Sequence, residues 1–151
     1  MKEYKTDINT LPAAIGAVTD GEDDLIANLA NSAALIYEIV PDLNWAGFYI
    51  LKGDTLVLGP FQGKVACTRI KAGRGVCGTA VASKKAQVVD DVHDFSGHIS
   101  CDAASVSEMV VPLFKDGKIF GVLDLDSPVA GRFNAIKDVI LKAAAEVEKI
   151  L

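Results

Sequence analysis

Residues 108–126 read EMVVPLFKDGKIFGVLDLD. Both halves of this stretch are rich in β-branched, aromatic and other apolar residues, which favours two short strands. The halves meet at Lys115-Asp116-Gly117-Lys118, and Asp-Gly between two apolar runs is the signal of a tight hairpin. The stretch therefore predicts two adjacent antiparallel strands, over residues 108–114 and 118–126.

Further strands and helices are predicted around this hairpin. Short runs of the same kind, separated by Gly, Asp and Pro, predict strands over residues 44–52, 55–58 and 64–70. Apolar residues at helical spacing predict helices over residues 25–40 and 133–150, with a short helix over 76–84 after a glycine-rich turn. Helices on either side of a run of strands indicate an α+β sandwich.

The composition limits the possible classes of protein. The chain has 151 residues, 50% of them hydrophobic, and a formal net charge of −5, which suits one folded domain over residues 1–151. We treat residues 1–20 as an N-terminal extension. The acidic balance argues against nucleic acid and anionic membranes as partners. The apolar stretch 11–18 contains Pro12 and Gly16, which argues against a secretory signal peptide. No run reaches the roughly 20 apolar residues of a membrane span, so a cytoplasmic protein is predicted.

The cysteines indicate redox chemistry rather than structural cross-links. Cys67, Cys77 and Cys101 form an odd set whose spacing fits neither a disulfide framework nor a structural zinc site. His93 and His98 precede Cys101, but the three lack the tight ligand spacing of a zinc site, so no metal is expected. Free thiols in a reducing compartment are the simpler interpretation.

The three cysteines differ in their expected environments. Cys77 lies at the start of the predicted helix 76–84, where oriented amide groups favour a thiolate, although a buried apolar role is the alternative. Cys101 lies in the long polar loop 90–107, where His98 could activate it and Asp102 would oppose its ionisation.

The sequence pattern predicts a structural role for Cys67. It shares one face of the predicted strand 64–70 with Val65 and Arg69, which favours a structural role.

Acidic residues gather near the hairpin. Asp124 and Asp126 lie two apart, so both project from one face of a strand. A two-residue turn would set Glu108 opposite Leu125, whereas a three-residue turn would set it opposite Asp124 and give a cluster of three acids. Such a cluster raises at least one pKa and supplies a proton donor, while the alternative is that these are solvated turn residues.

An aromatic pair marks the first strand. Trp45, Gly47 and Tyr49 share one face, so two rings flank a position without a side chain. That shape suits a small ligand, although a strand buried on both faces would look the same.

Several segments taken in order resemble one known family. They are NWAGFY (44–49), LGPFQG (58–63), AC (66–67), GRGVCG (73–78), VDDV (89–92), GHI (97–99), CDAAS (101–105), SE (107–108) and LDLDSP (123–128). From about Leu25 to the C-terminus the chain resembles the free methionine-(R)-sulfoxide reductases, which are built on a single GAF domain.

The resemblance implies a fold and an assembly. It implies a GAF-like domain with a central antiparallel sheet of about six strands flanked by helices, a closed pocket for the free amino acid, and a homodimer. It also implies that five side chains surround the substrate: Trp45, Tyr49, Glu108, Asp124 and Asp126. This arrangement favours the three-residue hairpin turn.

The resemblance further implies roles for the thiols. Cys101 resembles the catalytic nucleophile and Cys67 the recycling thiol that forms a disulfide with it, while Cys77 is a third catalytic cysteine whose role is less settled. The helix argument ranks Cys77 first among the thiols, and we follow the resemblance instead.

The expected activity is reduction of free L-methionine-(R)-sulfoxide in oxidative stress repair. Thiolate attack on the substrate sulfur would give methionine and a cysteine sulfenic acid, and a second cysteine would convert this acid to a disulfide. Thioredoxin or another dithiol would restore the thiols, and no bound cofactor is expected. The alternatives are a non-catalytic GAF module that binds a small molecule, and a thiol redox sensor.

Overall fold

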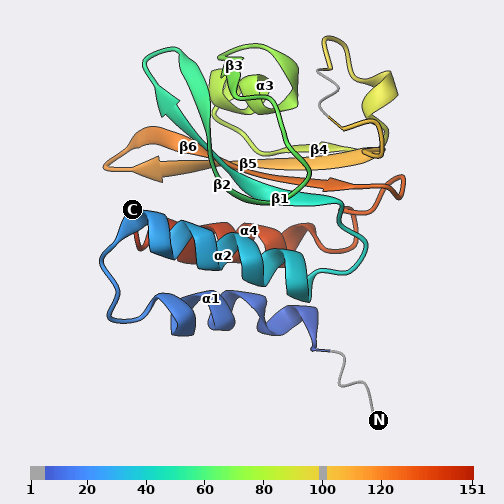
Figure 1. Ribbon diagram of the computed structural model, residues 1–151. Coiled ribbons are helices and arrows are strands. Elements are labelled where there is room, and N and C mark those ends of the chain that lie inside the picture. The colour runs from blue at the N-terminus through green and yellow to red at the C-terminus, as the bar shows by residue number, and fades with distance from the viewer. Residues whose placement is uncertain (1–5, 99–101) are drawn as a thin grey trace.

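A six-stranded antiparallel sheet forms the centre of the computed structural model, which describes residues 6–98 and 102–151 (Figure 1). Its strands lie in the order β3-β2-β1-β6-β5-β4. They are β1 Trp45–Lys52, β2 Thr55–Gly63, β3 Arg69–Lys71, β4 Gln87–Val89, β5 Ser107–Lys115 and β6 Lys118–Ser127. The predicted α+β architecture with a central antiparallel sheet of about six strands is confirmed.

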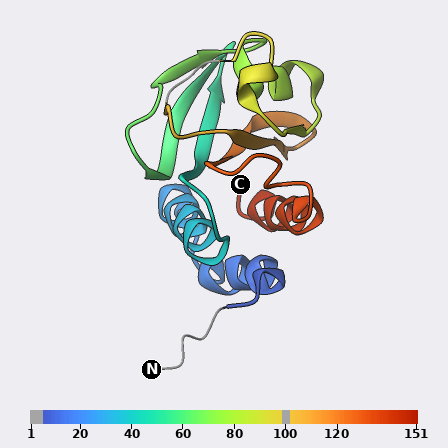
Figure 2. The same ribbon diagram turned by 90° about the vertical axis from the view of Figure 1, so that its right-hand side faces the viewer.

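The helices cover the two faces of the sheet unequally. They are α1 Leu11–Thr19, α2 Leu25–Ile39, α3 Gly75–Ser83 and α4 Lys137–Glu148, with 3-10 turns at Ile8–Thr10 and Val92–Asp94. Helices α2 and α4 lie against one face with α1 beyond them, and α3 lies over the opposite face (Figures 1 and 2). The sheet is therefore buried on both sides.

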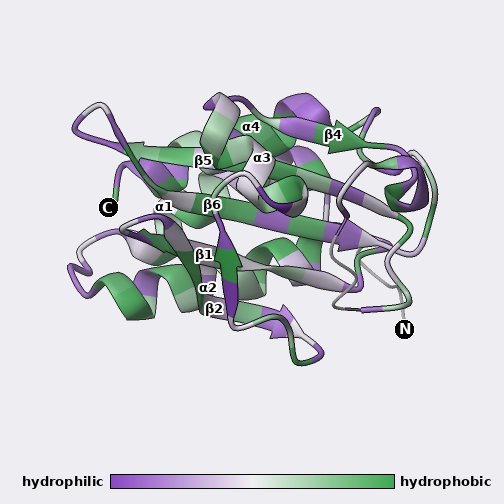
Figure 3. Ribbon diagram, turned by 90° about the horizontal axis from the view of Figure 1, so that it is seen from above, coloured by the Kyte–Doolittle hydropathy of each residue, from purple (hydrophilic) through white to green (hydrophobic). Residues whose placement is uncertain are grey.

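Alternation along β6 separates two cores. Leu123 and Leu125 point into the larger core, which is shared with α1, α2 and α4. Val122 belongs to the smaller core, which is shared with α3. Asp124 and Asp126 follow Val122 at a period of two, so they project toward the α3 side. The hydrophilic end of this otherwise apolar strand is visible in Figure 3.

Helix α1 is a feature that the sequence interpretation missed. The sequence predicts only an N-terminal extension for residues 11–19, yet Leu11 and Ile15 are fully buried in the larger core. Pro12 lies in the first turn of α1, where the backbone N–H has no partner within the helix, so it is compatible with the helix. The extension therefore contributes to the core.

The strands between β1 and α3 also differ from the prediction. Strand β2 runs on to Gly63, which has a φ of 129°, and residues 64–68 are irregular. The predicted strand 64–70 is reduced to β3, so the placing of Cys67 on one strand face with Val65 and Arg69 was wrong. The short edge strand β4 was not predicted, because three residues are too few to show a period.

The hairpin has neither of the two predicted registers. Asp116 and Gly117 form a two-residue turn with φ values of 52° and 76°, and Lys115 pairs with Lys118. The register then shifts by one residue, because Phe114 pairs with Ile119 whereas Leu113 pairs with Gly121. Such a bulge inserts one extra residue into one strand and changes what lies opposite. Glu108 therefore pairs with Asp126, not with Leu125 or Asp124.

Candidate functional site

A cavity on the α3 side of the sheet brings together most of the predicted site residues. Residues 65–66, the start of α3, and His98 and Asp102 beside the polar loop contribute to its wall. Six of the predicted site residues line it: Trp45, Tyr49, Cys77, Glu108, Asp124 and Asp126. They come from four elements that are far apart in the sequence, namely β1, α3, β5 and β6.

The three acids form the floor of this cavity. Glu108 and Asp124 are 7% and 6% exposed, and Asp126 is partly buried. The bulge in the hairpin places Glu108 on the same face as both aspartates, because Glu108 pairs with Asp126 and Asp124 lies one period away. The predicted cluster of three acids is therefore present, although the predicted three-residue turn is not.

Burial and mutual repulsion change how these acids titrate. Burial raises the pKa of Glu108 well above its usual range, and the charges of Asp124 and Asp126 raise it further. Burial likewise raises the pKa of Asp124 and, together with the charges of Asp124 and Asp102, the pKa of Asp126. The cluster thus holds protons at pH values at which exposed carboxyls have lost theirs.

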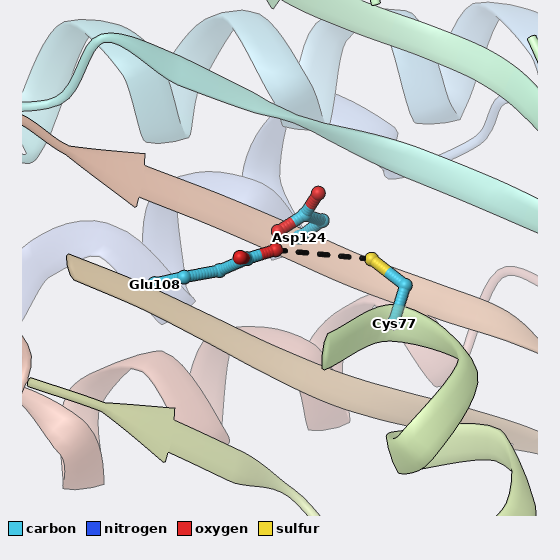
Figure 4. Close-up of side chains that lie close together, drawn as sticks. All are labelled: Cys77, Glu108 and Asp124. Atoms are coloured by element: carbon cyan, nitrogen blue, oxygen red, sulfur yellow. Dashed lines mark hydrogen bonds between the residues drawn. The ribbon is translucent and has the colours of Figure 1, made fainter. Parts of the chain in front are cut away.

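Cys77 lies directly over these carboxyls. The residue is 4% exposed, and its Sγ atom donates a hydrogen bond to Glu108 Oε1 over a distance of 4.0 Å (Figure 4). Burial, followed by the charge of Asp124, raises the pKa of the Cys77 thiol well above its usual range. The prediction of a low pKa at the helix N-terminus was therefore wrong, because burial and nearby carboxylates outweigh the amide groups of α3.

Aromatic rings form one wall of the cavity. The rings of Trp45 and Tyr49 stack with centroids 5.9 Å apart, and Phe61 stacks on Trp45 at 5.2 Å. A Cβ atom at Gly47 would lie 2.3 Å from the Cβ of Phe61. The space beside Gly47 is thus filled by Phe61, so the predicted ligand gap at this position was wrong. Sequence reasoning missed Phe61 because it pairs with Gly47 across two strands.

Two side chains of the same wall donate hydrogen bonds to the backbone of the segment that contains Cys67. Trp45 Nε1 donates to the carbonyl of Lys64 at 3.1 Å, and the Tyr49 hydroxyl donates to the carbonyl of Cys67 at 2.9 Å. Burial raises the pKa of Tyr49, so this hydroxyl remains a donor. Residues 65–66, immediately before Cys67, line the cavity.

The predicted nucleophile Cys101 lies outside the described residues, but nearby residues on both sides of it reach the cavity. His98 Nε2 is 3.9 Å from Glu108 Oε2, and burial lowers the pKa of His98. Asp102 accepts hydrogen bonds from the amide of Ala104 at 2.9 Å and from Asn44 Nδ2 at 3.1 Å. The hydrogen bond from Ala104 is the main cause that lowers the pKa of Asp102.

His98 and Asn44 are site residues that the sequence did not predict. The sequence indicates His98 as a possible activator of Cys101, whereas its contact with Glu108, which joins two distant segments, was not predicted. Asn44 also donates to Ser105 Oγ at 3.0 Å, which fastens the end of the polar loop to the start of β1. No local pattern signals such long-range contacts.

The raised carboxyl pKa values predict a pH dependence of stability. In the unfolded chain a glutamic acid loses its proton near pH 4, whereas folded Glu108 keeps it to higher pH. Above about pH 4 the folded state therefore binds more protons than the unfolded state, and this group contributes less to stability as the pH rises through its folded pKa. The free energy of unfolding changes by at most about 1.4 kcal/mol per pH unit for one such group.

Glu108→Gln removes this effect. The free energy of unfolding of the variant, relative to the parent protein, is expected to increase as the pH rises above about 4, as measured by urea denaturation. Glu38→Gln, at an exposed position on α2, is the matched control and should show no such trend. A Glu108→Gln curve parallel to that of the parent would contradict the raised pKa.

Comparison with known proteins places the chain in a family. Residues 23–146 match the family model for the GAF domain. The free methionine-R-sulfoxide reductase of Escherichia coli (strain K12) is 54% identical over 150 residues, which cover 99% of this chain and 89% of that protein. Fold and family model together define a GAF-domain protein.

Solved structures agree with this assignment. The fRMsr of Staphylococcus aureus in complex with substrate is 45% identical with a TM-score of 0.91, covering 100% of this chain and 99% of that one. The free methionine-R-sulfoxide reductase of Neisseria meningitidis in complex with its substrate is 44% identical with a TM-score of 0.90, covering 95% and 87%. The chain belongs to the free methionine-R-sulfoxide reductase family, as the sequence motifs predicted.

Within residues 6–98 and 102–151, no helix has the length and apolar character needed to cross a membrane.

Proposed function

We propose that this protein reduces free L-methionine-(R)-sulfoxide to L-methionine in the cavity beside α3. The observation that supports this most directly is the buried cluster of Glu108, Asp124 and Asp126, which lines one cavity with the aromatic wall. Relatives named for this activity match nearly the whole chain. A buried acid cluster suits a substrate that has both an ammonium group and a polar sulfoxide.

The acids supply the proton that the reaction needs. A sulfoxide oxygen only accepts hydrogen bonds, so a carboxyl group must be protonated, or act through a water, to bind it. The raised pKa values of the cluster keep such a proton available near neutrality. A carboxyl of the cluster that is ionised pairs with the substrate ammonium group, which favours a free amino acid over a methionine within a peptide.

Cys101 is the proposed nucleophile. Its thiolate attacks the substrate sulfur and forms an S–S bond while a carboxyl group of the acid cluster protonates the sulfoxide oxygen. The hydroxyl group then transfers from the substrate sulfur to the cysteine sulfur, the S–S bond breaks, and methionine leaves as the thioether. The cysteine is thereby oxidised to sulfenic acid. Cys67 then attacks this sulfur, water leaves, and a Cys67–Cys101 disulfide forms. An external dithiol, for which we propose thioredoxin, reduces the disulfide to two thiols.

The proposal also covers the cellular compartment and the oligomeric state. A reducing cytoplasm suits an enzyme that needs free thiols, and we propose a homodimer from the family resemblance. No bound cofactor is required by the chemistry, because the electrons come from the thiols.

The direct test is methionine release from free L-methionine-(R)-sulfoxide with dithiothreitol as reductant. Turnover of the free (R) form alone is expected, with the (S) epimer and a peptide-bound sulfoxide as controls. Absence of turnover with every form would refute the enzyme and favour a binding module. Disulfide formation with peroxide in that case would favour the redox sensor.

Asp126→Asn tests the role of the acids. Loss of a proton donor typically costs 10²–10⁴-fold, and we expect kcat to fall by about 100- to 1,000-fold with the fold retained. The measurement is steady-state kinetics with free sulfoxide, together with thermal unfolding. Asp20→Asn, at an exposed position after α1, is the matched control and should leave kcat unchanged. Unchanged kinetics in Asp126→Asn would remove this acid from the mechanism.

A further inference from the structure

Cys77 is a buried thiol that the proposed reaction does not use. It is free in the structure and lies against two buried carboxyl groups. Cys77, Glu108 and Asp124 each offer one ligand atom, and the three atoms lie within 4.8 Å of one another (Figure 4). We propose that these three side chains form a binding site for Zn²⁺ or a chemically similar divalent cation, and that the cation competes with the sulfoxide substrate.

The distances suit a tetrahedral ion. Zinc bonds are about 2.3 Å to sulfur and about 2.0–2.2 Å to carboxylate oxygen, which sets sulfur and oxygen about 3.5 Å apart in a tetrahedron. Cys77 Sγ and Glu108 Oε1 are 4.0 Å apart. A side-chain movement of about half an ångström therefore brings them into coordination distance. Three protein ligands leave the fourth position open to a water.

A second observation points to a missing ligand. Asp124 is only 6% exposed, and its buried Oδ1 atom has no hydrogen-bond partner among the described residues. A buried carboxylate oxygen without a partner is costly, and a divalent cation would supply that partner. Among the described residues that line the cavity, Arg74 is the one lysine or arginine. The acid cluster therefore has little positive charge beside it.

Competition with substrate follows from shared carboxyls, and this part rests on the proposed function. The ammonium group of the amino acid and the cation both pair with the same acid cluster. Binding of the cation releases the thiol proton, and any carboxyl protons, to solvent without oxidation or reduction. The cation is thus a reversible inhibitor.

The test uses Cys67→Ser/Cys101→Ser, in which Cys77 is the sole cysteine, titrated with Co²⁺ in place of Zn²⁺. We expect a sulfur-to-cobalt charge-transfer band in the near ultraviolet that saturates at one equivalent. Adding Cys77→Ser should abolish the band. Absence of the band in the protein that retains Cys77 would overturn the site. Thermal unfolding checks that each variant is folded.

A second variant tests the oxygen ligands. Asp124→Asn in the same double-serine background should raise the Co²⁺ dissociation constant by at least about 100-fold, because loss of an outer-shell partner alone costs 10–100-fold. An unchanged dissociation constant would exclude Asp124 as a ligand and overturn the proposal as stated.

The same band separates this inference from the proposed function. Free L-methionine-(R)-sulfoxide added to the cobalt-loaded double variant should bleach the band along a saturation curve whose midpoint rises with the Co²⁺ concentration. A band that persists at saturating sulfoxide would overturn the competition. Cobalt binding is read without turnover, so failure of the enzyme assay and failure of the metal site are distinguished.

Discussion

Cys101→Ser is expected to abolish reduction of free methionine sulfoxide entirely. Serine oxygen at neutral pH does not replace a thiolate as the nucleophile, and it cannot take up the substrate oxygen as a sulfenic acid. The measurement is methionine release over many enzyme equivalents, with either dithiothreitol or thioredoxin as reductant. The variant should keep the thermal stability of the parent, which separates loss of chemistry from loss of fold.

Cys77→Ser is the comparison for this result. Burial and the neighbouring carboxylates keep the Cys77 thiol protonated, so it is a poor nucleophile, and its variant should retain multiple turnovers. Full turnover by Cys101→Ser, together with complete loss in Cys77→Ser, would show that the nucleophile is wrongly assigned.

Cys67→Ser is expected to stop after about one equivalent of methionine per enzyme when thioredoxin is the sole reductant. In the proposed mechanism the first oxygen transfer needs only Cys101, but without Cys67 no intramolecular disulfide forms for thioredoxin to reduce. Rapid-quench measurement of methionine gives the size of this first burst.

Dithiothreitol provides the internal control. This small dithiol attacks the sulfenic acid directly, so it should restore multiple turnovers to Cys67→Ser. Equal steady-state rates of parent and Cys67→Ser with thioredoxin would exclude Cys67 as the recycling thiol.

The hairpin shows how far periodicity reaches. Period-two alternation correctly placed Asp124 and Asp126 on one face, and the Asp-Gly turn correctly predicted antiparallel neighbours. The residue opposite Glu108 depended on the bulge between Leu113 and Phe114, which no sequence signal marks. A shift of one residue decides whether the third acid joins the cluster, so the cluster followed from family resemblance and not from the pattern.

Cys77 shows the limit of local electrostatics. The helix and its N-terminus were predicted correctly, but the pKa of the thiol depends on carboxyls that reach it from β5 and β6. Burial and charge from distant segments are tertiary properties. Local sequence therefore predicts the backbone around this thiol and not its reactivity.

Short and irregular segments account for most of the remaining differences. Helix α1 contains Pro12 and Gly16, which weaken a helical pattern, and it is stabilised by burial of Leu11 and Ile15. The segment 64–68 reads as a strand because Val65 and Cys67 alternate with other residues, yet Val65 is 87% exposed. Its path is set by hydrogen bonds from Trp45 and Tyr49, which belong to another strand.

Those two hydrogen bonds join the aromatic wall of the cavity to the backbone of the Lys64–Cys67 segment, which ends at the proposed recycling thiol. A ligand that displaces either ring would lengthen or break the hydrogen bond of that ring to this backbone. Trp45 is the sole tryptophan of the chain, so its emission reports changes at this contact without any added label.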